Sequence, residues 1–139
     1  MKPKGPVAAC PCGSGLAYAA CCGALHAGAA AASPVHLMRA RYAAYVLGRE
    51  DYLLATWHPS TRPQSLNLSA EPQTKWLGLE VRAHQQIDPD QGTVAFVARY
   101  RSAGRGHRLQ ELSRFRRQDG HWYYVDGDVT ERQPGPLRT

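Results

Sequence analysis

The sequence predicts an α+β fold, in which two helices pack on a four-stranded antiparallel meander and a small cysteine-rich segment comes first. Three observations lead to this fold class. The four cysteines of the 139-residue chain all lie in its first 22 residues. Apolar residues have helical spacing between residues 34 and 57, and they alternate with period two from residue 77 onward. Helices that precede a run of strands cover one face of the sheet, which makes two layers.

Length and composition suit one compact domain with a small appendage, since 139 residues with 43% hydrophobic content can bury a core. The predicted parts are a metal-binding knuckle at residues 1–26, a linker of small residues at 27–33, the main domain at 34–128 and a disordered tail at 129–139. The formal net charge is +6, and seven arginines lie between residues 99 and 117. The distribution of charge therefore matters more than its total.

The cysteine-rich segment has the spacing of a metal site. Cys10 and Cys12 are followed by Cys21 and Cys22, so a short loop joins two close pairs. Zn²⁺ takes four thiolates tetrahedrally in structural sites, with Zn–S distances of about 2.3 Å. Glycines in and after the loop allow the backbone to wrap closely around an ion. We therefore expect one zinc ion as cofactor, held by all four cysteines.

Two disulfides and free buried thiols are the alternatives to zinc. Disulfides crowded into 22 residues would not stabilise the other 117, and adjacent Cys21 and Cys22 could bond only through a strained ring. Whether His26 replaces one thiol as a ligand stays open. Four thiolates leave no coordination position for water, so a catalytic zinc is not expected.

No export signal or membrane span is expected. Only a handful of residues separate Lys4 from Cys10, whereas a signal peptide needs 7 to 15 apolar residues before its cleavage site. No run approaches the roughly 18 apolar residues of a membrane span. We therefore expect a cytoplasmic protein that does not bind membranes.

The first predicted helix covers residues 34–47. Ser33 is its N-cap, Pro34 occupies the first helical position, where no N–H is needed, and Gly48 ends it. A second short helix over residues 51–57 should end before Pro59, because the residue before a proline avoids helical geometry. Residues 59–75 are polar and rich in proline, which is typical of a loop.

Four strands are predicted at residues 78–87, 93–102, 107–117 and 121–127, with short turns between them. The last turn, Asp119-Gly120, is a strong two-residue hairpin signal, so it fixes a register. In this register Gln118 faces His121 and, counting back, Ser113 faces Asp126. Side chains alternate along a strand. The side chains expected on the inner face are therefore those of Glu111, Ser113, Phe115, Trp122, Tyr124 and Asp126.

The inner carboxylates need a partner, because an unpaired buried charge is costly. Arg41, on the first helix, is the expected partner of Glu111 or Asp126. A structural ion pair and a ligand site both fit this set. If the site is an enzyme's, Glu111 or Asp126 is its base, Arg41 the orienting partner and His58 the nearby imidazole. The expected pocket residues are Trp57, Ser113, Phe115, Trp122 and Tyr124.

The outer face of the sheet is predicted to be basic. Arg99, Arg101, Arg114 and Arg116 point outward in the same register, where they could meet phosphates or an acidic protein. A solvated sheet face is the alternative interpretation. Because no aromatic side chains are interleaved with these arginines on the same face, sequence-specific nucleic-acid binding is not expected.

These residues also resemble known families. CPCGSG at residues 10–15, Tyr18 and CCG at 21–23 resemble the SEC-C zinc motif, named for the C-terminal tail of the SecA preprotein translocase. Further segments are similar to the bacterial YchJ family, namely SPVHLMRARYAAY at 33–45, TWHP at 56–59, WLGL at 76–79, FVAR at 96–99 and WYYVDG at 122–127. The resemblance implies a nuclear-transport-factor-2-like (NTF2-like) fold, in which helices wrap a curved sheet into a cone with a pocket.

The resemblance also implies that Cys10, Cys12, Cys21 and Cys22 are the zinc ligands, but it supplies no reaction. Family members often carry a second SEC-C motif after the sheet, whereas residues 128–139 contain no cysteine. Two functions remain. One is a non-enzymatic adaptor that docks a protein or ribosomal surface through its zinc knuckle and arginine-rich face, as SEC-C tails bind partners in the translocase. The other is a small-molecule binder or a hydrolase- or isomerase-type enzyme that uses the cone pocket.

Overall fold

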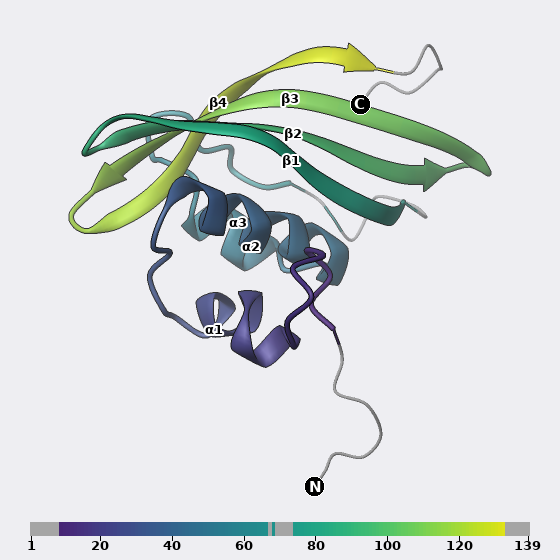
Figure 1. Cartoon of the computed structure of the whole chain (residues 1–139), viewed down its shortest axis with the longest axis horizontal. Helices are drawn as coiled ribbons and strands as arrows, with labels where there is room; N and C mark the ends of the chain where they lie inside the picture. Colours follow the sequence, from purple (N-terminus) through teal and green to yellow (C-terminus); the bar gives the residue numbers. More distant parts are fainter. Residues whose placement is uncertain (1–8, 67, 69–73, 133–139) are drawn as a thin grey trace, which may run out of the picture.

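The structure, a computed structural model, describes residues 9–66, 68 and 74–132, and these form the predicted α+β architecture (Figure 1). In chain order the elements are the 3-10 turn η1 (Tyr18–Ala20), α1 (Cys22–His26), α2 (Pro34–Leu47), α3 (Glu50–Ala55), β1 (Lys75–Asp88), β2 (Gln91–Ser102), β3 (Arg105–Gln118) and β4 (His121–Arg132). No helix of the described residues is long and apolar enough to cross a membrane.

Helix α2 has the predicted bounds and the predicted caps. The Ser33 side chain accepts a hydrogen bond from the His36 backbone N–H, Pro34 is the first helical residue, and Gly48 ends the helix at a φ of 72°. The left-handed conformation at Gly48 is one that glycine adopts without a steric penalty. The buried face of α2 includes Leu37, Met38, Ala40, Arg41 and Tyr42.

Helix α3 is shorter than the predicted 51–57, since it covers Glu50–Ala55. The backbone after it bonds to strand β4 instead of continuing the helix. The Tyr124 N–H donates to the Thr56 carbonyl at 2.9 Å, and the His58 N–H donates to the Tyr124 carbonyl at 2.8 Å. These two bonds place Trp57 beside Tyr124 in a parallel bridge, so tertiary pairing ends the helix before Pro59 can.

The described strands form one antiparallel meander in the order β1-β2-β3-β4, as predicted. Each strand extends beyond its predicted range. The last turn has φ values of 55° at Asp119 and 81° at Gly120, the positive values that a type I′ hairpin requires. Residues 129–132 belong to β4, so the tail expected from residue 129 is wrong for these four. Residues 133–139 lie outside the described residues.

The predicted register of β3 and β4 holds only near the turn. Gln118 pairs with His121 and Phe115 with Tyr124, but a β-bulge at Val125 shifts the ladder by one residue. Asp126 therefore pairs with Arg114, and Gly127 takes the predicted place of Asp126 opposite Ser113. A shift of one residue exchanges the two faces of a strand. The prediction that Asp126 faces inward is wrong.

Three layers result, with α2 and α3 between the sheet and the cysteine-rich segment (Figure 1). Helix α2 contacts β1, β2 and β4 on one side and α1 on the other. Buried side chains from all three layers form one hydrophobic cluster, which includes Cys10, Cys12, Cys22, Leu37, Met38, Tyr42, Phe96 and Phe115. The cysteine-rich segment thus packs on the side of α2 that faces away from the sheet, and no helix of the described residues covers the outer sheet face.

Candidate metal centre and candidate cavity

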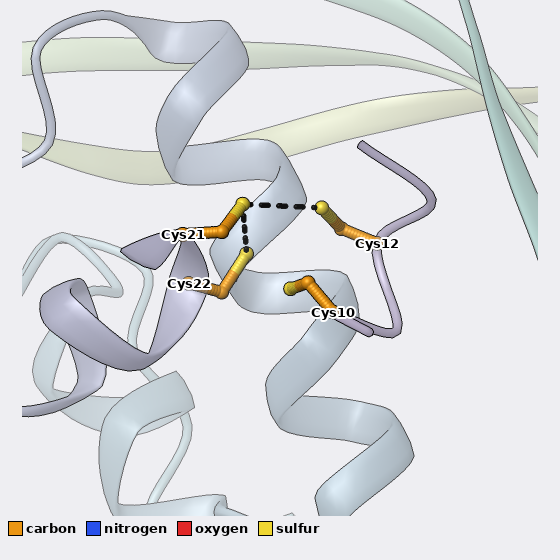
Figure 2. Close-up of side chains that lie close together, drawn as sticks. All are labelled: Cys10, Cys12, Cys21 and Cys22. Carbon is orange, nitrogen blue, oxygen red and sulfur yellow. Dashed lines mark hydrogen bonds between the residues drawn. The ribbon is translucent and has the colours of Figure 1, made fainter. Parts of the chain in front are cut away.

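The four cysteine side chains converge on one point between the N-terminal loop and α1 (Figure 2). Their Sγ atoms all lie within 4.8 Å of one another. The Cys12–Cys21 and Cys21–Cys22 sulfur distances are 3.6 and 3.9 Å. Sulfurs at tetrahedral positions around a zinc ion, each about 2.3 Å from it, are about 3.8 Å apart. The cluster therefore has the dimensions of a tetrahedral four-sulfur metal site.

A tight turn brings Cys10 and Cys12 to this point. The Cys10 N–H donates to the Leu16 carbonyl at 2.9 Å, and the Gly13 N–H donates to the Cys10 carbonyl at 3.1 Å. The chain reverses through Gly13 and Gly15, whose φ values are 82° and 89°. These left-handed values are a conformation that glycine adopts readily.

All four thiols are free, so the structure does not contain the alternative disulfides. A hydrogen bond between the Cys12 and Cys22 side chains lowers the pKa of the Cys12 thiol to about 4. The same bond raises the pKa of the Cys22 thiol. Burial raises the pKa of Cys10. Four thiolates this close to one another would repel strongly, so the four thiols cannot all lose their protons unless a cation lies between them. A divalent metal ion would supply that positive charge.

His26 lies outside the sulfur cluster, because both of its ring nitrogens have other partners. Nδ1 lies 2.6 Å from the Tyr18 hydroxyl, and Nε2 lies 2.8 Å from the Ala40 carbonyl of α2. A neutral ring satisfies both bonds, since Nε2–H donates to the carbonyl and Nδ1 accepts from the hydroxyl. Burial lowers the pKa of His26, which favours this neutral form. His26 thus fastens α1 to α2.

A second bond joins the cluster to α2. The Arg39 Nη1 donates to the Cys12 carbonyl at 3.0 Å. Cys10, Cys12 and Cys22 are also buried in the same cluster as the apolar residues of α2. The structure therefore attaches the metal-binding segment firmly to the helical layer.

The second candidate site is a cavity of about 230 Å³ between α2 and the inner face of the sheet. It contains the predicted pocket residues Trp57, Ser113 and Tyr124, together with Arg41 and Glu111. The other lining residues are Met38, Tyr42, Tyr45, Trp76, Phe96, Ala98 and Leu109. The cavity is smaller than the roughly 300–1,000 Å³ of sites for drug-sized ligands.

Arg41 is buried at one side of this cavity, with 4% of its surface exposed. Its Nη1 donates to the Leu53 carbonyl and to Thr56 Oγ1, both at 2.8 Å. Its Cζ atom lies 5.1 and 4.6 Å from the ring centroids of Trp57 and Tyr124. Burial lowers the pKa of Arg41. The predicted salt bridge to Glu111 or Asp126 is wrong, because Arg41 is in no ion pair of the described residues.

Glu111 is half-buried on the inner face, as the register predicted. Its Oε2 accepts hydrogen bonds from the Tyr124 hydroxyl at 3.0 Å and from Ser113 Oγ at 3.1 Å. Burial and the neighbouring Glu111 raise the pKa of Tyr124, so its hydroxyl stays protonated as a donor. Glu111 is therefore held in place by neutral donors rather than by a cation.

Sequence reasoning missed Gly127, which makes room for Glu111. A Cβ atom built at Gly127 would overlap Glu111 Oε2 and lie 3.0 Å from its Cγ. A glycine within a strand often marks a bulge or a close approach. Gly127 lies two residues after the bulge at Val125. This glycine is therefore the feature of the sequence that indicates a bulge nearby.

Four predicted residues lie outside the cavity. Asp126 is on the outer face, where Arg114 Nε donates to its carboxylate at 2.6 Å. His58 is at the surface, with Nε2 2.9 Å from Gln118 Oε1. Phe115 is buried in the core. Trp122 borders a different surface pocket, beside His26 and Tyr52.

The predicted outer arginines do point outward, but they form two groups rather than one stripe. Arg99 and Arg101 pair with residues 108 and 106 of β3, whereas Arg114 and Arg116 lie on β3 itself. Six residues from position 108 to 114 separate the groups by about 20 Å, at roughly 3.3 Å a residue. Arg114 is bonded to Asp126 and Asp128, which neutralise it. In the described residues Arg101 and Arg116 have no ion pair.

Comparison with known proteins finds a matching family for the main domain and a matching motif for the cysteine-rich segment. The family model described as "YchJ, middle NTF2-like domain" matches residues 33–127, and the SEC-C motif matches residues 8–24. A UPF0225 protein of Bordetella parapertussis is 55% identical, over 92% of this chain and 98% of its own. The resemblance seen in the sequence is thus confirmed.

Two solved structures have the same fold. The solution structure of a SEC-C motif containing protein from Rhodopseudomonas palustris has a TM-score of 0.79 and 38% identity, covering 88% of this chain and 98% of that one. The crystal structure of a SEC-C motif containing protein from Psychrobacter arcticus has a TM-score of 0.73 and 29% identity, covering 88% and 82% of the two chains.

Proposed function

Because the chain belongs to the YchJ-like UPF0225 family and carries a SEC-C motif, we propose that it is a zinc-binding adaptor and not an enzyme. Its zinc knuckle, residues 9–26, holds one ion and docks on a partner protein. The observation that carries this proposal is the closed cluster of four sulfur atoms.

Zinc is the metal that suits these ligands best. Four thiolates in a tetrahedral arrangement select zinc or iron–sulfur chemistry, and structural zinc sites are closed in this way. Such a site leaves no position for water or substrate. Its role is then to fix the shape of the knuckle. The need for reduced thiols also favours the cytoplasm as the compartment.

The knuckle presents a surface suited to docking. The turn at residues 13–16 is exposed, and Leu16 at its end has 53% of its surface exposed. The cysteine-rich segment as a whole lies on the helical side of the sheet, away from the outer sheet face (Figure 1). A partner that covers Leu16 therefore leaves the outer sheet face accessible.

The basic outer face is a second contact in this proposal, made with acidic groups. Its most available charge is at the end near the β2–β3 turn, where Arg101 is exposed and is in no ion pair of the described residues. Arg114 contributes little, because Asp126 and Asp128 neutralise it. The knuckle and this face lie on opposite sides of the molecule. A substitution in one should therefore remove its own contact and leave the other contact in place.

Affinity capture from a bacterial lysate tests the adaptor, with the zinc-loaded full-length chain as bait. Leu16→Asp changes the docking surface without touching a thiol, whereas Cys10→Ser with Cys12→Ser removes two ligands. Ile87→Asp is the matched control, because Ile87 is an exposed apolar residue of β1. The proposal expects one protein, free or ribosomal, to be retained by the wild type and by Ile87→Asp and lost with the other two variants. Equal recovery by all four baits would contradict it.

A further inference from the structure

The cavity under α2 is built for a small flat molecule. Its volume of about 230 Å³ lies below the range for drug-sized ligands, so it suits a single-ring compound. Aromatic side chains form much of its wall, among them Tyr45, Trp57, Trp76 and Phe96. Such walls favour a planar apolar body, which they contact face to edge or in offset stacks.

Arg41 supplies a cation at one side of the cavity. Only its Nη1 donates hydrogen bonds within the described part of the chain, to Leu53 and Thr56. The Nε and Nη2 groups donate none there, and neither is fully buried, since no Arg41 nitrogen is among the buried side-chain atoms without a partner in the described residues. They are therefore open to a ligand in the cavity that Arg41 lines. Cation–π contacts with the rings of Trp57 and Tyr124 compensate part of the hydration that the guanidinium loses. An anionic group on a ligand would supply the missing acceptors, in the bidentate geometry that a guanidinium prefers.

Glu111 supplies an acceptor in the same cavity. Its Oε2 is occupied by Ser113 and Tyr124, whereas its Oε1 accepts no hydrogen bond from the described residues. Since Glu111 lines the cavity, a carboxylate oxygen of it that has no donor favours a ligand with an O–H or N–H group. The bonds at Oε2 keep the side chain oriented before a ligand arrives.

We propose that this cavity binds a small aromatic carboxylic acid that also carries a hydrogen-bond donor. The ligand carboxylate meets Arg41, the donor meets Glu111, and the ring lies among the aromatic side chains. This binding site is separate from the zinc knuckle, so it does not depend on the proposed docking function.

Three related probes test the proposal by calorimetry on the zinc-loaded full-length protein. 4-Hydroxybenzoate has both polar groups, benzoate lacks the donor, and methyl 4-hydroxybenzoate lacks the anion. Hydrogen bonds to charged groups make 4-hydroxybenzoate the tightest binder, by about tenfold to a hundredfold over each analogue. Equal affinities for the three probes, or no heat of binding at millimolar concentration, would overturn the proposal.

Variants then assign the two polar contacts. Glu111→Gln keeps the shape of the side chain and should weaken 4-hydroxybenzoate about tenfold while leaving benzoate unchanged. Arg41→Met should abolish the preference for the acid over its methyl ester. Asp126→Asn is the control on the outer face and should change nothing. If Arg41→Met fails to fold, Glu111→Gln and the probe series still decide, since a Glu111→Gln variant that binds both acids like the wild type overturns the assignment.

Discussion

At the scale of single residues, Gly127 shows how one missing side chain positions a carboxylate. A Cβ at Gly127 would overlap Glu111, whose carboxylate is fixed by Ser113 and Tyr124. Gly127→Ala should therefore lower the free energy of unfolding by about 1–3 kcal/mol, the usual cost of overpacking. Urea unfolding monitored by tryptophan fluorescence measures this change.

Two comparisons isolate the cause. Gly106→Ala is the matched control, because Gly106 is also a strand glycine and nothing lies within 4 Å of a Cβ there. In a Glu111→Ala background the Gly127→Ala change should cost much less, since the overlapping atoms are gone. The explanation fails if the cost is the same in both backgrounds.

The stability of the folded protein should depend on pH through His26. Burial lowers its pKa, so the folded protein binds this proton less readily than the unfolded chain, whose histidine has a pKa near 6.5. The stability that neutral His26 contributes is full above about pH 6.5 and is lost as the pH falls below it. Urea midpoints at pH 7.5 and 5.5 should therefore differ more for the wild type than for His26→Gln. The same pH dependence in both proteins would count against this role.

At the scale of elements, α2 depends on its N-cap. Ser33 accepts a hydrogen bond from the His36 N–H, which would otherwise have no partner within the helix. Ser33→Ala should cost about 1 kcal/mol of unfolding free energy, whereas Ser33→Asp should keep the cap and most of the stability. Equal urea midpoints for the wild type and Ser33→Ala would show that this cap does not stabilise the fold.

The knuckle should lose its order when zinc is removed, while the sheet should keep its own. Four thiols that lose their cation have no other interaction of comparable strength, whereas β2 and β3 are held by their ladder and by α2. After chelation, hydrogen exchange should be fast in residues 10–26 and unchanged in β2 and β3. Because Arg39 and His26 join the knuckle to α2, partial loss of protection in α2 is also expected. Loss of protection throughout the sheet would mean that the fold requires the metal.

At the scale of the whole molecule, local signals predicted the fold well, and tertiary contacts decided the rest. Ser33, Pro34 and Gly48 set both ends of α2 by rules that act within one helical turn. The Asp119-Gly120 turn fixed the nearest pairs of β3 and β4. The face of Glu111 was predicted correctly, because it follows from the alternation of side chains along β3, counted back from the turn. The extra residue of the bulge lies on β4 and does not disturb that alternation.

The candidate site was predicted only in part, because two tertiary features alter it. The bulge at Val125 has one nearby signal, the strand glycine Gly127, which does not by itself fix the position of the extra residue. The bulge placed Asp126 on the outer face, beside Arg114. Likewise, the pairing of Thr56 and His58 with Tyr124 joins segments more than 60 residues apart in the chain. This pairing leaves the His58 ring at the surface, beside Gln118. The convergence of the four cysteines on one point could be predicted from the sequence, since all four lie within a 13-residue span.

The central claim is that Cys10, Cys12, Cys21 and Cys22 enclose one zinc ion in a closed structural site. X-ray absorption spectroscopy at the zinc edge, on protein purified without chelator, tests it most directly. We expect one zinc per chain, surrounded by four sulfur atoms at about 2.3 Å and by no nitrogen or oxygen. A first shell with three sulfur atoms and a water oxygen would contradict the claim, because it would give the metal the open position of a catalytic site.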